Sequence, residues 1–359
     1  MRILSVVGAR PQFIKAFSVS RELRPKHDEI LVHTGQHYDE EMSDVFFDEL
    51  GIPEPDYNLG VGSDSHAEQT AAMMTGLEEL VDEHEPDVVL CYGDTNSTLA
   101  AGIVASKMDP ELAHVEAGLR SFNRDMPEEV NRVLTDHASD YLFVPSGRAA
   151  ANLREEGVED RVYNTGDVMY DSILWARERA ADASSILDDL SLSEGEYALA
   201  TVHRPRNTDE PERLATIVDV LGEVSREVVL PAHPRTVSRL EEHGLREDAE
   251  RAVTLIDPVG YLDFVRLLDG AWRVVTDSGG VQKEAFFLDT PCVTLREETE
   301  WDETVESGWN VLVGADRDAI RSALDRGFDL DREKPEPYGD GNAAEKVRLA
   351  LEGRYESES

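Results

Sequence analysis

The first seventeen residues, MRILSVVGARPQFIKAF (1–17), decide the fold and point to a ligand. The apolar run over residues 3–7 does not alternate with polar residues, so it predicts a strand covered on both faces. Arg10, Pro11 and Lys15 follow within about two turns of a predicted helix, and Pro suits the first helical position. A core needs no cations there, whereas an anion bound at a helix N-terminus does.

Runs of the same kind recur along the chain with helix-like stretches such as 66–84 and 208–224 between them. They lie at residues 2–8, 29–34, 87–93, 112–118, 140–146, 161–166, 197–204, 226–233, 253–257, 272–280, 291–297 and 310–314. Alternation of strand and helix predicts an α/β fold with parallel sheets and right-handed crossovers. These runs are too many for one ordinary sheet, so we expect two domains that divide near residues 166–185. The amphipathic segment 341–353 has no strand of its own and could pack on either domain.

The composition excludes several classes of protein. With 35 basic and 75 acidic residues the net charge is −40, which argues against nucleic acid or an anionic membrane as a partner. We interpret this acidity as an adaptation to a cytosol of very high salt. The chain lacks a long apolar segment and a leader-like N-terminus, so we expect a cytoplasmic protein. Cys91 and Cys292 are expected to be buried thiols, and no spacing suggests a metal site.

Unusual polar residues follow many of the predicted strands, and this clustering is the main evidence for an active site. They are Arg10, Asp94, Glu116, His203, Arg204, Ser278, Gly279 and Gly280. In open α/β sheets, ligands bind at the carboxyl ends of the strands. The Ser-Gly-Gly segment can begin a helix and let the backbone approach an anion, and Glu284 beyond it could accept hydrogen bonds from a ribose diol.

Each of these residues also has a plain structural interpretation. Asp94 could be an ordinary helix cap, His203 a structural histidine, and the Ser-Gly-Gly segment a simple helix entry. Glu128 and Glu129 could merely complement a helix dipole. Glu116 follows an apolar run directly, where desolvation would raise its pKa toward the range useful for proton transfer.

Seven stretches together resemble the non-hydrolysing UDP-N-acetylglucosamine 2-epimerases. They are GARPQFIK (8–15), HTGQHYD (33–39), YGDTNSTLA (92–100), HVEAGLRSF (114–122), MPEEVNR (126–132), TVHRPRN (201–207) and TDSGGVQKEA (276–285). The resemblance implies two Rossmann-like domains facing across a cleft, as in GT-B glycosyltransferases, with the last helix crossing back to the first domain. It places the N-terminal domain at 1–168 plus 341–359, with the catalytic carboxylates, and the UDP-binding C-terminal domain at 169–340.

The resemblance implies an isomerase that inverts C2 of UDP-GlcNAc by eliminating UDP and adding it back, without a metal or cofactor. It further implies a homodimer that acts in polysaccharide biosynthesis. By motif, it assigns proton transfer and sugar positioning to Asp94, Glu116 and Glu128, and contacts with the diphosphate region to Arg10, Lys15, His203, Ser278, Gly279 and Gly280. His203 is also expected to be catalytic, and Arg204 to bind the substrate. Glu284 matches the ribose-binding residue, Phe264 the uracil contact, and His37 and His233 a regulatory UDP-GlcNAc site.

Departures from the family pattern leave alternatives open. Ala9 and Gln12 replace the usual residues of GTRPE, Trp301 stands where bacterial members often have Arg, and Pro234 and Arg235 replace an Asn-containing turn. The last change weakens the regulatory site. Trp301 leaves room for a modified sugar, such as a 2,3-diacetamido glucuronic acid derivative. A GT-B glycosyltransferase, a hydrolysing epimerase and a non-catalytic sensor of nucleotide sugars are the other hypotheses.

Overall fold

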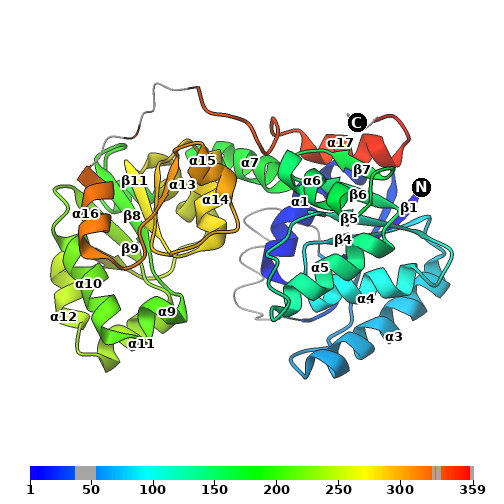
Figure 1. The fold of residues 1–359 in the computed structure, drawn as a ribbon, viewed down its shortest axis with the longest axis horizontal. Helices are drawn as coiled ribbons and strands as arrows, with labels where there is room; N and C mark the ends of the chain where they lie inside the picture. The colour runs from blue at the N-terminus through cyan, green and yellow to red at the C-terminus, as the bar shows by residue number, and fades with distance from the viewer. Residues whose placement is uncertain (37–53, 326–327, 329–332, 356–359) are drawn as a thin grey trace. The chain divides into compact units, whose positions relative to one another are not determined.

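The chain folds into two compact units in the computed structural model (Figure 1). Met1–Ser172 and Glu336–Ser359 form the N-terminal unit, and Ile173–Pro335 form the C-terminal unit. The structure describes residues 1–36, 54–325, 328 and 333–355, apart from the side chain of Arg10.

The described part of the N-terminal unit contains a seven-stranded sheet in which all pairings are parallel. Its strands are β1 (Arg2–Val7), β2 (Asp28–His33), β3 (Tyr57–Asn58), β4 (Val88–Tyr92), β5 (Glu111–Val115), β6 (Tyr141–Val144) and β7 (Val162–Asn164). Their order in the sheet is β3-β2-β1-β4-β5-β6-β7. The direction of winding therefore reverses between β1 and β4, the place where α/β sheets bind ligands.

The C-terminal unit repeats this plan with six parallel strands among its described residues. They are β8 (Tyr197–Thr201), β9 (Glu227–Pro231), β10 (Thr254–Ile256), β11 (Arg273–Thr276), β12 (Cys292–Thr294) and β13 (Asn310–Leu312). The order β10-β9-β8-β11-β12-β13 is the Rossmann order, with its switch point between β8 and β11. The predicted α/β class with two Rossmann-like domains is thus confirmed.

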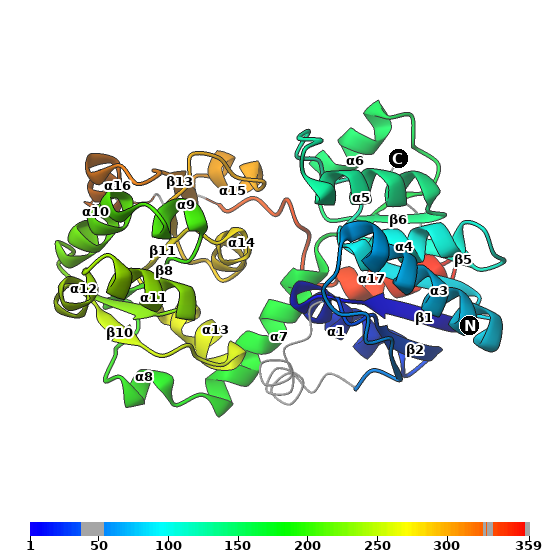
Figure 2. The same cartoon turned by 90° about the horizontal axis from the view of Figure 1, so that it is seen from below.

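Helices connect successive strands and cover the sheets (Figures 1 and 2). The N-terminal unit has α1 (Arg10–Leu23), α3 (His66–His84), α4 (Asn96–Ala105), α5 (Pro127–Ala138), α6 (Gly147–Glu155) and α17 (Ala343–Leu351), and α7 (Val168–Ala183) leads out of it. The C-terminal unit has α8 (Ile186–Asp189), α9 (Pro205–Thr208), α10 (Pro211–Gly222), α11 (Pro234–Glu242), α12 (Arg246–Ala252), α13 (Tyr261–Gly270), α14 (Gly279–Phe287), α15 (Asp302–Glu306) and α16 (Arg317–Asp325).

The strands are apolar because both faces are buried. In β1 and β4, Leu4, Val6 and Val89 pack against Leu77 of α3 and Ala101 of α4 in one core cluster. Burial of this kind contributes on the order of 25 cal/mol per Å² of apolar surface to the free energy of unfolding.

Both cysteines are buried free thiols, as predicted, and burial raises the pKa of Cys292 to about 12. In the described ranges, no helix is both long and apolar enough to span a membrane.

The last helix belongs to the N-terminal unit, which confirms the predicted crossing back. On α17, the buried Arg348 pairs with Glu22 of α1 at 3.3 Å and with Glu345 and Glu352 of the same segment at 3.0 Å. The backbone N–H groups of Ala343 and Ala344, at the start of α17, donate to the Asp171 carboxylate at 3.0 and 2.9 Å. These contacts fix the C-terminal segment on the first sheet's unit.

Asp171 makes the stability of this unit depend on pH. Burial raises the pKa of Asp171 to about 6, against the two N–H donors. Between about pH 4 and 6, the folded chain therefore keeps a proton on Asp171 that the unfolded chain has already released. This contribution to stability is lost as the pH rises through that window.

We expect the difference in the free energy of unfolding, wild type minus Asp171→Asn, to fall by at most about 3 kcal/mol between pH 4 and 6.

Urea unfolding at fixed salt measures this difference, with Asp340→Asn as the matched control. Asp340 is exposed, and its hydrogen bond from Lys346 lowers its pKa, so its contribution to stability is lost as the pH falls toward acid and not as it rises from 4 to 6. A difference between wild type and Asp171→Asn that stays level from pH 4 to 6 would contradict the assignment.

Candidate active site

Two groups of polar residues lie at the two switch points, one in each unit. We call Lys15, Asp94, Glu116, Glu129 and Arg132 the N-terminal cluster. The C-terminal cluster consists of His203, Arg204, Asp277, Ser278, Gly279, Gly280 and Arg296. Each is described within its own unit.

A buried ion pair joins Lys15 of α1 to Glu116, which directly follows β5. Only 8% of the Lys15 side chain and 10% of the Glu116 side chain is exposed. Glu116 has φ +71°, a backbone conformation that is rare for a residue with a side chain and that recurs at functional sites. A Cβ on Gly93 would lie 3.4 Å from both charged groups, so the glycine keeps the end of β4 open beside them. The sequence did not predict that Lys15 is the charged partner of Glu116.

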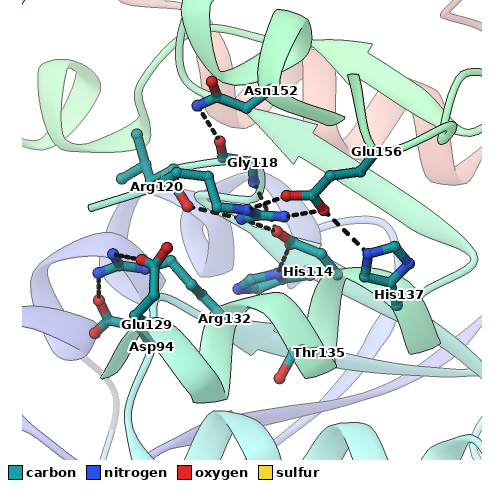
Figure 3. Close-up of polar contacts among 12 residues, drawn as sticks. Asp94, His114, Gly118, Arg120, Glu129, Arg132, Thr135, His137, Asn152 and Glu156 are labelled. Carbon is teal, nitrogen blue, oxygen red and sulfur yellow. Dashed lines mark hydrogen bonds and ion pairs between the residues drawn. The ribbon is translucent and has the colours of Figure 1, made fainter. Parts of the chain in front are cut away.

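Arg132 of α5 holds the second carboxylate. Its guanidinium contacts Asp94, which follows β4, and lies 2.8 Å from Glu129 (Figure 3). The Asn131 side chain donates to the backbone carbonyl of Asp94 at 3.0 Å. Asp94 is therefore fixed by α5 through both its backbone and its side chain, and that side chain is about one third exposed.

The two glutamates at the start of α5, Glu128 and Glu129, have different environments in the structure. Glu129 is buried and accepts hydrogen bonds from the backbone N–H groups of Ser121 and Phe122 at 2.8 and 3.0 Å. Burial alone would raise the pKa of Glu129, but the Ser121 hydrogen bonds and the Arg132 charge outweigh it and hold this pKa low. Glu129 thus stabilises the turn at Phe122, which has φ +56°. Glu128 is exposed and is the one available to a ligand.

In the C-terminal cluster, the buried Asp277 organises the segment that follows β8. Its carboxylate accepts hydrogen bonds from the backbone N–H groups of His203 and Arg204 at 3.1 and 3.0 Å and from Asn207 at 3.1 Å. His203 Nδ1 lies 3.4 Å from the same carboxylate, and its ring lies 5.9 Å from that of His233. Burial lowers the pKa of His203, and His233 and Arg204 lower it further, against the effect of Asp277. A neutral imidazole can accept or pass a proton near neutral pH.

The Ser278-Gly279-Gly280 segment opens α14 and lies beside two arginines. A Cβ on Gly279 would lie 3.7 Å from the guanidinium groups of both Arg204 and Arg296 and 3.6 Å from the Glu300 carboxylate. Ser278 makes no side-chain cap bond, so the first N–H groups of α14 are not capped by that hydroxyl. A helix N-terminus flanked by two guanidinium groups is suited to an anion such as a phosphate.

The remaining predicted residues have the following places. Glu284 is buried within α14, Phe264 is partly exposed on α13, and His233 is an exposed cap of α11 whose Nδ1 accepts from the Arg235 N–H at 3.1 Å. His37 and the side chain of Arg10 lie outside the described residues. Across the described ranges, no group of three or more metal-binding side chains is positioned to hold an ion.

Comparisons with known proteins match this fold and these motifs. The family model described as UDP-N-acetylglucosamine 2-epimerase matches residues 21–352. This chain belongs to the UDP-N-acetylglucosamine 2-epimerase family. It is 49% identical over 350 residues to a UDP-N-acetylglucosamine 2-epimerase homolog of Methanococcus maripaludis, covering 97% of this chain and 98% of that protein.

Two further members of the 2-epimerase family bear on the substrate. The UDP-2,3-diacetamido-2,3-dideoxy-D-glucuronate 2-epimerase of Pseudomonas aeruginosa is 48% identical over 359 residues, covering 97% of this chain and 98% of that protein. The crystal structure of Methanocaldococcus jannaschii UDP-GlcNAc 2-epimerase in complex with UDP-GlcNAc and UDP superposes with a TM-score of 0.85. Its identity is 41%, over 98% of this chain and 100% of that chain.

Within this 2-epimerase chain, sequence reasoning missed the residues that hold the predicted ones in place. Arg132 lies inside the MPEEVNR stretch (126–132), and Asp277 directly precedes Ser278, but the local sequence predicts no role for either. A charged residue close to a predicted site residue in the sequence is a signal that it belongs to the site. The side chains that such a residue contacts are distant in sequence and could not be predicted.

Trp301, which stands where bacterial members often have Arg, has its ring centroid 3.9 Å from the ammonium of the buried Lys283 of α14.

Proposed function

We propose that this protein is a non-hydrolysing 2-epimerase that interconverts UDP-GlcNAc and UDP-ManNAc. The observation that carries the proposal is that the two clusters differ in charge. The C-terminal cluster has two guanidinium groups at a helix N-terminus, and the N-terminal cluster has carboxylates held at the carboxyl edge of a sheet. Nucleotide binding requires the cations, whereas it gives no reason for the carboxylates.

The proposal assigns the nucleotide part to the C-terminal cluster. Arg204 and the Ser278-Gly279-Gly280 helix start would bind the diphosphate, Glu284 the ribose and Phe264 the uracil. Lys15 and Arg10, at the start of α1, would add positive charge for the departing diphosphate. His203, between Asp277 and His233, would take part in the proton transfers of the cycle.

The reaction would run in two balanced steps. A carboxylate among Asp94, Glu116 and Glu128 removes the C2 proton while the C1–O bond breaks, so that UDP leaves and a 2-acetamidoglucal forms. UDP then adds back to C1 as C2 is protonated on the opposite face. Removal of a weakly acidic C–H proton needs a base and an acid in one site, which carboxylates of differing environment provide. Glu116 differs from Asp94 and Glu128 in its buried pairing with Lys15.

A modified substrate, UDP-2,3-diacetamido-2,3-dideoxy-glucuronate, is the second candidate. The 48% identity to the Pseudomonas aeruginosa enzyme favours it, and Trp301 in place of the usual Arg is compatible with it. No observation favours a glycosyltransferase or a sensor over an epimerase. A regulatory second site at His233, a cytoplasmic location and a role in polysaccharide biosynthesis stay predictions.

The activity is tested by proton NMR in D2O with each of the two UDP-sugars. We expect deuterium at C2 and the appearance of the C2 epimer for the true substrate. Glu116→Gln should lower turnover by at least ~10²-fold, the scale of general acid–base residues, while UDP affinity is retained. Glu111→Gln, an exposed change on β5, the strand that Glu116 follows, is the control. Near-normal turnover of Glu116→Gln would remove Glu116 from the mechanism.

The net charge of −40 leads to a prediction about salt. At about 1 M salt the screening length falls to roughly 3 Å, so repulsion among the acidic side chains is suppressed. We expect the melting temperature and activity to rise steeply between dilute buffer and molar KCl, as followed by circular dichroism and turnover. Full folding and activity in dilute buffer would contradict the halophilic interpretation.

We propose that the enzyme is a homodimer, as the family resemblance suggests. Light scattering coupled to gel filtration in molar KCl should give twice the chain mass of 39.9 kDa. A mass equal to that of one chain at micromolar concentration would refute this.

A further inference from the structure

A buried histidine–aspartate pair lies behind the N-terminal cluster and has no place in the proposed mechanism. His114 on β5 and Asp136 on α5 are both fully buried, and His114 Nδ1 lies 2.7 Å from Asp136 Oδ1. The other ring nitrogen, Nε2, lies 2.6 Å from the backbone carbonyl oxygen of Gly93. The imidazole therefore spans from α5 to the end of β4.

The second oxygen of Asp136 holds the loop that follows β5. Asp136 Oδ2 accepts the backbone N–H of Gly118 at 3.1 Å and the Arg120 guanidinium at 2.6 Å. Arg120 continues to Glu156 through two contacts, at 2.7 and 2.8 Å (Figure 3). Gly118 has φ +78°, and a Cβ there would lie 2.4 Å from the Ala149 carbonyl oxygen, so this loop has little freedom to move.

A count of donors and acceptors defines the charge of the pair. A carbonyl oxygen only accepts, so His114 Nε2 must carry a hydrogen toward Gly93. Asp136 Oδ2 accepts from the backbone N–H of Gly118 and from the Arg120 guanidinium, contacts that suit an ionised carboxylate. An ionised carboxylate also only accepts, so the hydrogen-bond geometry puts a hydrogen on Nδ1 as well.

The two loops joined by this pair carry the candidate catalytic carboxylates. Gly93 directly precedes Asp94, and Gly118 follows Glu116 by two residues. Asp136 thus holds the Glu116 loop directly and the Asp94 loop through His114. Arg132, one turn earlier on α5, contacts the Asp94 side chain itself.

Stability alone does not account for a buried charged pair. Replacement of buried ion pairs by apolar residues of similar volume is often neutral or stabilising by about 1–4 kcal/mol. Accurate placement of catalytic groups is a better explanation, because a displacement of about 1 Å can cost roughly 10²-fold in rate. A charged pair with directional hydrogen bonds to two loops can hold the catalytic groups on those loops in place.

We propose that His114 and Asp136 are positioning residues that fix the Asp94 and Glu116 carboxylates relative to each other, with His114 held as an imidazolium. This inference rests on the proposed function for its catalytic part. Neither residue touches the reacting atoms.

The charge state is tested without turnover, by ¹⁵N NMR of the histidine rings in the wild-type protein. We expect two protonated nitrogens on His114 at neutral pH and a neutral ring in Asp136→Asn, assigned with His114→Gln. A single protonated nitrogen on His114 in the wild type would overturn the imidazolium, whether or not any variant folds.

The positioning role is tested by kinetics on Asp136→Asn, which keeps the shape but turns one acceptor into a donor. We expect kcat to fall by about 10- to 10²-fold with little change in KM or in UDP affinity by calorimetry. Glu156→Gln is the matched control, since it changes the same ion network on the far side of Arg120 and leaves the contacts of His114 and Gly118. Its kcat should stay close to that of the wild type.

The outcomes separate this inference from the proposed function. An unchanged kcat in a folded Asp136→Asn, or equal losses in both variants, would overturn the positioning role. A wild-type protein that exchanges no C2 hydrogen in either UDP-sugar would refute the epimerase and with it the catalytic part, while the NMR experiment would still decide the charge state of His114.

Discussion

Charged side chains at the carboxyl edge of a parallel sheet have to be paired, because that edge is partly buried. An ionised group left there without a partner would cost several kcal/mol. Glu116 is paired with Lys15, Asp94 with Arg132, and Asp277 with the backbone of the loop that follows β8. Most other features of the two clusters, including the positive φ of Glu116 and the glycine at position 93, follow from bringing these groups together.

One helix supplies many of the partners in the N-terminal unit. Along α5, Glu129 holds the turn at Ser121, Asn131 and Arg132 hold the Asp94 loop, and Asp136 reaches the Glu116 loop. These side chains lie on the buried side of the helix, whereas Glu128 faces outward. The same helix can thus present one carboxylate to a ligand and keep others as structural acceptors.

Strand positions were predictable because buried parallel strands are continuous apolar runs. Each of the twelve predicted runs overlaps a strand, whereas the two-residue β3 was missed because so short an edge strand leaves no pattern. The candidate site residues were predictable only as residues that follow strands. Their partners were not, since Arg132 and Asp94 are 38 positions apart and His203 and Asp277 are 74 apart, and no local pattern joins them.

Because α17 packs on the first unit, the N-terminal unit is made of two segments that are synthesised at different times. Residues 336–355 complete a body that begins at Met1, so the second unit is an insertion within the first. The N-terminal unit cannot finish folding on the ribosome until the whole of the other unit has been synthesised. A nascent chain that has just completed the C-terminal sheet still lacks the helix that covers α1.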